Sequence, residues 1–162
     1  MENRNPERNG KFRMLVDADA LPGPVKEIIC RAALRLSLET IFIASKHIQL
    51  IGSNLLKCEV VEIGADAADN AIVEKAGYGD LVITADVPLA DRVLARGADA
   101  IDPREDLYTV ENIKTKLAMR DLSKMLRDSG EMTGGPRKFG VKDTTAFARS
   151  FDALLTRKRG RG

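Results

Sequence analysis

The chain has 162 residues, of which 44% are hydrophobic, and its 26 basic and 24 acidic side chains give a formal net charge of +2. This length favours one domain with a single core. No run of about 18 apolar residues is present, and the polar start MENRNPERNGKFR lacks the apolar centre of a signal peptide, so we expect a soluble cytoplasmic protein without membrane contact.

The first half of the chain alternates β-rich runs with segments of helical periodicity. Its apolar run FRMLVD begins the series, and the apolar residues that follow Pro24 recur every three or four positions, as they do on one face of a helix. Strands are predicted at residues 12–17, 39–45 and 58–63, and helices at residues 24–36 and 66–77.

The second half continues this alternation. The run GDLVITAD at residues 79–86 is continuously apolar, which is typical of a central parallel strand. A short helix at 87–97, a brief strand at 99–102 and a helix at 109–130 follow. One face of that long helix carries Val110, Ile113, Leu117, Leu122, Met125 and Leu126, and the apolar side of the last helix carries Phe147, Phe151, Leu154 and Leu155.

Strands that alternate with helices predict an α/β fold with a mainly parallel central sheet, because each parallel connection needs a crossover. We expect a disordered polar tail at residues 1–11, one α/β domain at 12–156 and a basic tail at 157–162. In such a sheet the functional crevice lies beyond the carboxyl ends of the strands. Acidic residues at the carboxyl ends of the predicted strands are therefore candidate site residues.

Two aspartates, Asp17 and Asp19, come directly after the apolar run Met14-Leu15-Val16 of the first predicted strand. Side chains two apart on a strand share a face, so the two carboxylates lie side by side if the extended geometry persists. Like charges at the end of a buried strand repel unless one is protonated or a cation lies between them. This pair is the strongest indication of a metal site in the sequence.

Further carboxylates are expected at the same edge of the sheet. Asp86 follows the strand LVITA, and Asp66 and Asp69 lie where a loop enters a helix. A group of carboxylates with no basic residue among them suits magnesium or manganese better than zinc. Such a metal clamps a phosphate and activates a water for phosphodiester displacement.

Each of these acids also has a purely structural interpretation. Asp86 and Asp69 are both placed to cap helices, a role that Asp favours, and for each residue alone capping competes with metal ligation. Asp91, one turn into its helix, and Asn70, next to Asp69, are second-line candidates together with Asp66. Asp80 lies at the other end of its strand and is interpreted as a turn residue.

The segment MTGGPRKFGVKD at residues 132–143 is a candidate phosphate-binding loop. Glycines allow a close approach of the backbone, a hydroxyl and cations are available, and the N-terminus of a helix follows. The candidate phosphate-binding residues are Thr133, Gly134, Gly135, Arg137, Lys138 and Lys142. The alternative is a surface connection with incidental charges. Neither a P-loop nor a dinucleotide fingerprint is present.

The cysteines and the single histidine contribute little. Cys30 and Cys58 fit no zinc spacing or disulfide framework and are expected to be reduced thiols. His47 has no partner motif and is interpreted as a loop residue. Acid–base chemistry would therefore come from carboxylates or from metal-bound water.

Several motifs in order, LVDADALP, ADNAIVEKAGYGDLVITADVPLA, LAMRDLSKMLRDSG and TGGP, resemble the YaiI/YqxD family of uncharacterised bacterial proteins over residues 14–155. That family looks like a branch of the PIN-like superfamily, whose members are typically magnesium- or manganese-dependent ribonucleases that often dimerise. The resemblance implies that Asp17, Asp69 and Asp86 are the catalytic and metal-binding acids and that Asp19 is an added one. Leu21 stands where the family often has cysteine, which argues against a catalytic thiol.

The leading hypothesis is thus a Mg²⁺- or Mn²⁺-dependent nuclease or phosphodiesterase that acts on RNA and is a candidate homodimer. A non-catalytic nucleic-acid-binding or regulatory protein with a retained metal site is the first alternative. The second is a phosphatase of the haloacid dehalogenase type, which the DAD motif suggests but which usually has Thr or Val where this chain has Leu21. The absence of Trp and the scarcity of Tyr argue against base stacking and favour contact with the phosphate backbone.

Overall fold

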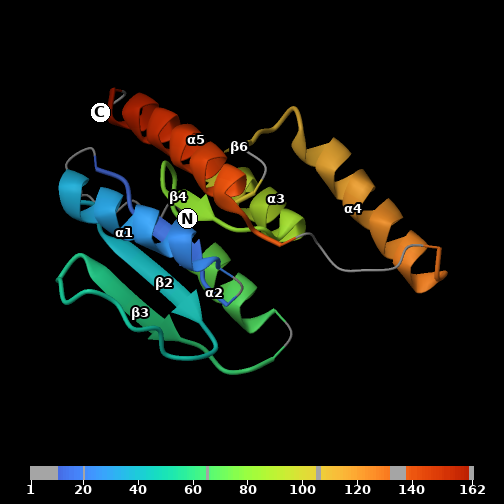
Figure 1. The fold of residues 1–162 in the computed structure, drawn as a ribbon, viewed down its shortest axis with the longest axis horizontal. Coiled ribbons are helices and arrows are strands. Elements are labelled where there is room, and N and C mark those ends of the chain that lie inside the picture. The colour runs from blue at the N-terminus through green and yellow to red at the C-terminus, as the bar shows by residue number, and fades with distance from the viewer. Residues whose placement is uncertain (1–10, 20, 65, 105–106, 132–137, 161–162) are drawn as a thin grey trace.

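The computed structural model describes residues 11–19, 21–64, 66–104, 107–131 and 138–160, and within them one sheet is flanked by helices (Figure 1). The strands are β1 (Met14–Asp17), β2 (Thr40–Ala44), β3 (Leu56–Val60), β4 (Leu81–Ile83), β5 (Asp99–Ile101) and β6 (Leu107–Tyr108). The helices are α1 (Gly23–Leu36), α2 (Ala67–Lys75), α3 (Val87–Ala95), α4 (Ile113–Asp128) and α5 (Val141–Gly160). The predicted α/β class is confirmed.

The strand order of the sheet is β3-β2-β1-β4-β5-β6. Strands β1 to β5 run parallel, and β6 is antiparallel to β5. Met14 at the start of β1 lies opposite Thr40 on one side and Leu81 on the other, so β1 is a central strand. The chain builds outward from β1 to β3 and then returns to β4. The strand order therefore reverses between β1 and β4, the position at which open α/β sheets bind ligands.

Alternation along β1 separates the two faces of the sheet. Met14 and Val16 pack against α1 and α5, whereas Leu15 packs against α2 and α3. Because residues two apart on a strand share a face, Asp17 continues the side of Leu15. The first strand thus directs its terminal carboxylate toward the layer that contains α2 and α3.

Several sequence expectations for the core hold. The run in β4 is a central strand whose three residues are fully buried, and the apolar side of α5 is buried, with the rings of Phe147 and Phe151 stacked at a centroid distance of 5.0 Å. Gly97, which ends the turn after α3, has a φ of +84°, and a side chain there would meet the Tyr78 ring. Among the described helices, none combines the length and apolar character needed to cross a membrane.

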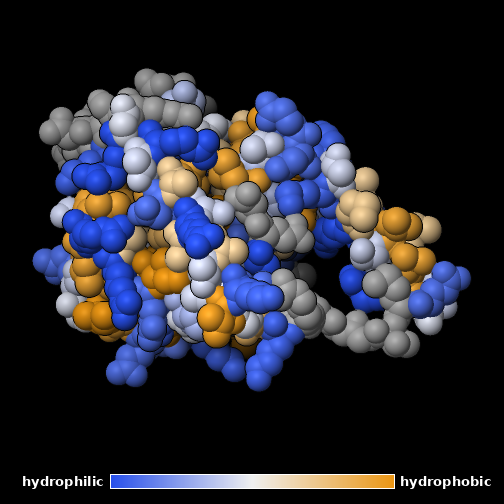
Figure 2. Space-filling model, turned by 45° about the horizontal axis from the view of Figure 1, so that its top comes forward, coloured by the Kyte–Doolittle hydropathy of each residue, from blue (hydrophilic) through white to orange (hydrophobic). Residues whose placement is uncertain are grey.

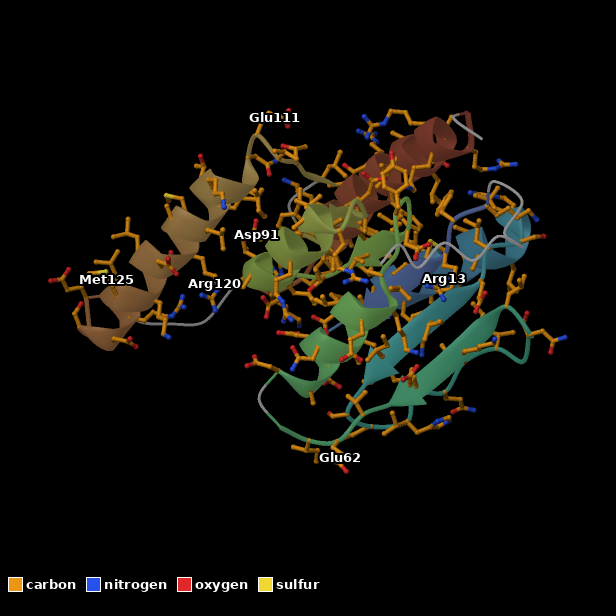
Figure 3. All side chains as sticks on the ribbon, turned by 180° about the vertical axis from the view of Figure 1, so that it is seen from behind. Arg13, Glu62, Asp91, Glu111, Arg120 and Met125 are labelled. Carbon is orange, nitrogen blue, oxygen red and sulfur yellow. The ribbon has the colours of Figure 1, made fainter. Side chains whose placement is uncertain are left out.

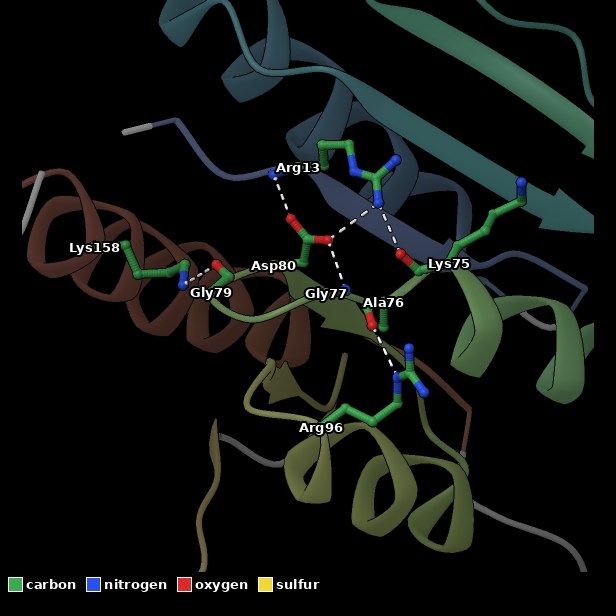
Figure 4. A network of polar contacts seen from close by, with 8 residues as sticks. All are labelled: Arg13, Lys75, Ala76, Gly77, Gly79, Asp80, Arg96 and Lys158. Atoms are coloured by element: carbon green, nitrogen blue, oxygen red, sulfur yellow. Dashed lines mark hydrogen bonds and ion pairs between the residues drawn. The ribbon is translucent and has the colours of Figure 1, made fainter. Parts of the chain in front are cut away.

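The amino-terminal edge of the sheet is held by a polar network around Asp80 (Figure 4). The fully buried Asp80 carboxylate accepts hydrogen bonds from the backbone N–H of Arg13 at 3.0 Å and from its guanidinium at 3.2 Å. It also accepts one from the backbone N–H of Gly77 at 2.9 Å, which closes the turn that enters β4. Asp80 is therefore a structural anchor at the edge opposite the other aspartates.

The expected basic tail at residues 157–162 needs correction for residues 157–160, which belong to α5. Lys158 explains the extra turn: its ammonium donates to the Gly79 carbonyl at 2.7 Å, pairs with Asp99 and lies 4.7 Å from the centre of the Phe12 ring. Only 6% of its side chain is exposed. The end of α5 is thus fixed to the amino-terminal edge of the sheet rather than free in solvent.

The predicted apolar face of residues 109–130 does not pack as one surface. Helix α4 begins at Ile113, which is buried, but 48% of Leu122 and 68% of Met125 are exposed, and Val110 lies exposed before the helix. Figure 1 shows α4 projecting away from the sheet and the other helices. Periodicity identified the helix correctly, but it could not show that most of its apolar side lacks a partner within the described residues.

Candidate metal centre

Asp17 forms the centre of an acidic cluster at the carboxyl edge of β1. Its Oδ2 accepts a hydrogen bond of 2.9 Å from the hydroxyl of Thr84, which follows β4. Burial raises the pKa of the Asp17 carboxyl, the Thr84 hydrogen bond opposes that rise, and the charges of Asp86 and Asp19 add to it. This carboxylate is therefore desolvated and surrounded by like charges, an arrangement that a cation would stabilise.

Asp86 combines two roles. Its Oδ1 accepts a hydrogen bond of 3.0 Å from the backbone N–H of Leu89, so the predicted cap of α3 is confirmed. Its charge also raises the pKa values of Asp17 and Asp69, and its backbone N–H donates to the Thr84 hydroxyl, which contacts Asp17. Capping uses one carboxylate oxygen, and no described residue donates a hydrogen bond to the other.

Thr84 is a residue that the sequence reasoning missed. Its side chain is almost fully buried, donates to Asp17 and accepts a hydrogen bond of 2.9 Å from the backbone N–H of Asp86. It thereby fixes two acids of the cluster relative to each other. The available signal was a polar side chain at the end of the apolar run LVIT, on the same face as Val82 and two residues before an acid.

Asp69 enters the cluster from the first turn of α2. Its pKa is raised to about 6 by burial first and then by the charges of Asp86, Asp17 and Asp66, while Arg92 lowers it. The N-cap of α2 is Asp66, whose side chain makes no capping hydrogen bond, so the interpretation of Asp69 as the cap is wrong. Asp69 instead presents an ionisable carboxylate to residues from β1 and α3.

Asp19 lies outside the extended strand, so the alternation that would place it beside Asp17 does not reach it. Strand β1 ends at Asp17, and Asp19 lies in the turn in which the Leu21 N–H donates to the Ala18 carbonyl. The Asp19 Oδ1 accepts hydrogen bonds from the backbone N–H and the hydroxyl of Ser45, at 2.7 and 3.1 Å, just beyond β2. Its charge still raises the pKa of Asp17, so Asp19 belongs to the border of the cluster.

The second-line candidates lie farther from the centre. Asp66 is exposed and has a left-handed backbone conformation with a φ of 69°. Asn70 is also exposed, and its Oδ1 accepts a hydrogen bond of 3.1 Å from the Arg92 guanidinium. Arg92 is therefore a cation beside the cluster, which the sequence did not predict. Asp91 faces α4, where Lys114 lies at 3.9 Å.

The candidate phosphate-binding loop is described only in part. Thr133, Gly134, Gly135 and Arg137 lie outside the described residues, whereas Lys138 and Lys142 are described and exposed. The buried Asp143 accepts a hydrogen bond of 2.9 Å from the backbone N–H of Gly140 in the first turn of α5. That carboxylate already neutralises part of the positive helix end. Anion binding here therefore depends on the lysines more than on the helix.

Arg104 is a second cation that the sequence reasoning missed at this edge of the sheet. It follows β5, and its guanidinium lies 5.3 Å from the centre of the Phe139 ring. Because α5 ends near Gly79 and Asp99 at the amino-terminal edge, its first turn lies toward the carboxyl edge. Lys138 and Arg104 thus share the sheet edge that carries the acidic cluster.

The donor chemistry of the cluster fits a hard cation, but its geometry is open. Asp17, Asp19 and Asp86 each use one carboxylate oxygen in the hydrogen bonds above. Nowhere in the described part of the chain do three His, Cys, Asp or Glu side chains converge into a ready-formed metal site. Magnesium is usually held by one or two carboxylates together with water and substrate phosphate, so an open site of this kind is compatible with it.

The remaining chemical side chains stay outside the cluster. Cys30 is buried and Cys58 half-buried, and both are free thiols, as expected. Burial raises the pKa of the Cys30 thiol, with Lys26 opposing and Glu27 adding to the shift, which makes it a poor nucleophile. His47 lies exposed in a loop.

Comparisons with known proteins connect these features to one family. The sequence model described as "Uncharacterized BCR, YaiI/YqxD family" matches residues 15–157. A UPF0178 protein of Sulfurimonas denitrificans is 48% identical over 90% of this chain and 97% of its own length. One from a Sulfurovum species is 49% identical over 89% of this chain and 97% of its own, and one from a Marinomonas species is 48% identical over 91% and 99%. No solved structure matches.

Proposed function

The chain belongs to the YaiI/YqxD family of uncharacterised proteins, and we propose that it is a divalent-metal-dependent phosphodiesterase that cleaves RNA. The observation that carries this proposal is the position of Asp17 and Asp86. Asp17 ends β1 and Asp86 follows β4, the two strands between which the strand order reverses, and Thr84 connects them. Asp69 adds a third carboxylate from α2.

The proposed ligands are the free oxygens of Asp17 and Asp86, with Asp69 completing the set and Asp19 bordering it. When bound, Mg²⁺ or Mn²⁺ would polarise a phosphate and lower the pKa of a coordinated water. Asp69 is the acid most easily protonated, and it must lose its proton to become a ligand. Thr84 orients the Asp17 carboxylate, and the hydrogen bond from Leu89 orients that of Asp86.

The proposed substrate follows from the cations near this edge and from the resemblance to PIN-like ribonucleases. Lys138, Lys142 and Arg104 supply positive charge for a phosphate backbone, while the described rim offers few exposed aromatic rings for base stacking. Backbone contact makes binding sequence-tolerant and strongly salt-dependent. The mainly parallel sheet supports membership of the PIN-like superfamily, which is part of the proposal.

The first test is a calorimetric titration of Mn²⁺ into the wild type, Asp86→Asn and an Asp19→Asn/Asp86→Asn double variant, with circular dichroism to verify folding. Asparagine caps helices as well as aspartate does, so Asp86→Asn removes charge but keeps the hydrogen bond to Leu89. The matched control is Asp152→Asn, which removes an acid that is 71% exposed and pairs with Arg35 on the other face. We expect Mn²⁺ binding to be lost in the cluster variants and kept in the control.

The second test uses end-labelled single-stranded RNA with Mg²⁺, Mn²⁺ or a chelator. The proposal expects cleavage that requires metal and disappears in Asp86→Asn. RNA binding without cleavage in any metal would identify the non-catalytic alternative. If the folded wild type and the cluster variants bind Mn²⁺ equally weakly, the aspartates serve only as helix caps and turn residues, and the proposed metal site is wrong.

A further inference from the structure

Helix α4 forms an arm that is attached to the domain at one end. Ile113 in its first turn is buried, Leu117 packs against the core on the α3 side of the sheet, and Lys114 lies 3.9 Å from Asp91 of α3. The later turns project from the body, as Figure 1 and Figure 3 both show. An isolated helix of this length is marginal in water, so its outer turns need further packing to be stable.

The outer turns carry an apolar strip, which we define as Ala118, Met119, Leu122, Met125 and Leu126. At about 100° per residue these side chains occupy an arc of roughly 120°, and no charged residue of α4 falls within it. The exposed fractions are 57% for Met119, 48% for Leu122 and 68% for Met125. Figure 2 shows apolar surface on this part of the arm.

The side of α4 opposite the strip is basic and carries Lys116, Arg120, Lys124 and Arg127. In Figure 3, Arg120 is on the side nearer α3, and Met125 is on the opposite side. The apolar strip therefore faces outward from the domain. A contiguous exposed strip of large apolar side chains at such a position is characteristic of an interaction surface.

No segment of this chain outside the described residues has the composition to cover the strip. Residues 1–10 (MENRNPERNG) and residues 132–137 (MTGGPR) contain Met1 and Met132 as their only large apolar side chains. The shorter undescribed pieces at 20, 65, 105–106 and 161–162 contain none. None of these segments therefore offers an apolar surface that matches the strip.

The charges along one edge of the strip indicate which partner would fit it. Lys114, Asp121 and Asp128 follow one another at intervals of seven residues and so line one edge. If two copies of α4 pack antiparallel about a twofold axis beside Asp121 and Leu122, Lys114 of each copy lies opposite Asp128 of the other. Asp121 then meets its own copy, and Arg120, at 3.5 Å from Asp121, reduces that repulsion.

We propose that the apolar strip of α4 binds the same strip of a second copy of this chain, in an antiparallel twofold pair. The arrangement buries Leu122 against Leu122 and Met125 near Ala118, and it satisfies the charges at both ends of the strip. Because α4 is only about 24 Å long, its contact is smaller than a standard protein interface, so the dimer forms reversibly.

The experiment is sedimentation velocity on the full chain over a concentration series from low micromolar to millimolar. The wild type should shift from monomer to dimer, and Leu122→Lys should raise the dissociation constant at least tenfold. The matched control is Ile51→Lys, which changes an apolar residue of similar exposure, 63%, outside α4 and should dimerise as the wild type does. Lysine is a good helix former, so the α4 variant should keep its fold.

The charge at Asp128 tests the antiparallel register without disturbing the contact of Lys114 with Asp91. Asp128→Lys should weaken the dimer several-fold, because it sets a lysine against Lys114 of the second copy, and Asp128→Asn should weaken it less. Leu122→Cys should give an intermolecular disulfide under mild oxidation, whereas Ile51→Cys should not, and neither should the wild type with its buried Cys30 and half-buried Cys58. A wild type that stays monomeric at millimolar concentration, or a Leu122→Lys variant that dimerises as strongly as the wild type, would overturn the proposal.

Discussion

The hydroxyl of Thr84 donates a hydrogen bond of 2.9 Å to Asp17 Oδ2 and connects the ends of β4 and β1 where the strand order reverses. The hydroxyl oxygen of Thr84 also accepts a hydrogen bond from the backbone N–H of Asp86, so one small side chain determines the spacing of two acids. A buried threonine in this position carries a role that neither acid can fill, because carboxylates do not donate to each other when both are ionised.

Replacing Thr84 with valine should weaken metal binding while the fold remains. The hydrogen bond from Thr84 lowers the pKa of Asp17, so its loss raises that pKa further and lets protons compete with the metal. By analogy with other residues that orient metal ligands, we expect Mn²⁺ affinity to fall about tenfold. Calorimetry of the wild type, Thr84→Val and Thr84→Ser measures it. Serine keeps the hydroxyl and should retain most of the affinity, and equal affinities for all three would remove Thr84 from the site.

Metal binding should depend on pH through Asp69. Its pKa in the metal-free protein is about 6, so below that pH the group is mostly protonated and must release a proton when it binds a cation. Mn²⁺ affinity should therefore increase as the pH rises through 6, with proton uptake by the buffer visible in calorimetry. Asp69→Asn should bind more weakly and lose this pH dependence. A wild type whose affinity is flat across this range would show that Asp69 is not a ligand.

Asp69→Asn should also stabilise the protein when no metal is present. The folded-state pKa of about 6 lies above the usual value of 3.8, so the stability associated with this group is complete below pH 3.8 and is lost as the pH rises through 6. The variant avoids that loss. Its melting temperature in a chelator should exceed that of the wild type above pH 6, and the difference should shrink as the pH falls toward 4. A variant that is less stable than the wild type above pH 6 would contradict the burial and repulsion assigned to Asp69.

Asp80→Asn should destabilise the fold without acting on the acidic cluster. The substitution removes the charge that pairs with Arg13 and leaves a buried amide where Arg13 and Gly77 donate to a carboxylate. We expect a loss of about 3 kcal/mol in the free energy of unfolding. In contrast, Asp152→Asn breaks an exposed pair at 3.7 Å and should cost under about 1 kcal/mol. Urea unfolding of both variants tests this, and equal losses would show that the Asp80 network is not a special anchor.

The sequence identified the positions of the cluster acids better than their contacts. Asp17 and Asp86 were assigned to the ends of two strands, and parallel strands bring such ends to one edge of the sheet. The extended-strand argument does not reach Asp19, because alternation relates neighbouring side chains only while the strand continues, and β1 ends at Asp17. Thr84 and Arg92 went unnoticed since their importance arises from residues far away in the chain.

By itself the sequence determined most elements of this fold, because apolar periodicity and breaker residues are local properties, but it did not predict the two-residue strand β6. It also determined which acids stand at strand ends. Only the tertiary structure decided that Thr84 connects two of them, that Lys158 is held at the opposite edge and that the apolar strip of α4 faces outward. A helical pattern specifies which side chains share a face, but what that face packs against depends on elements that are distant in sequence and meet only in the folded chain.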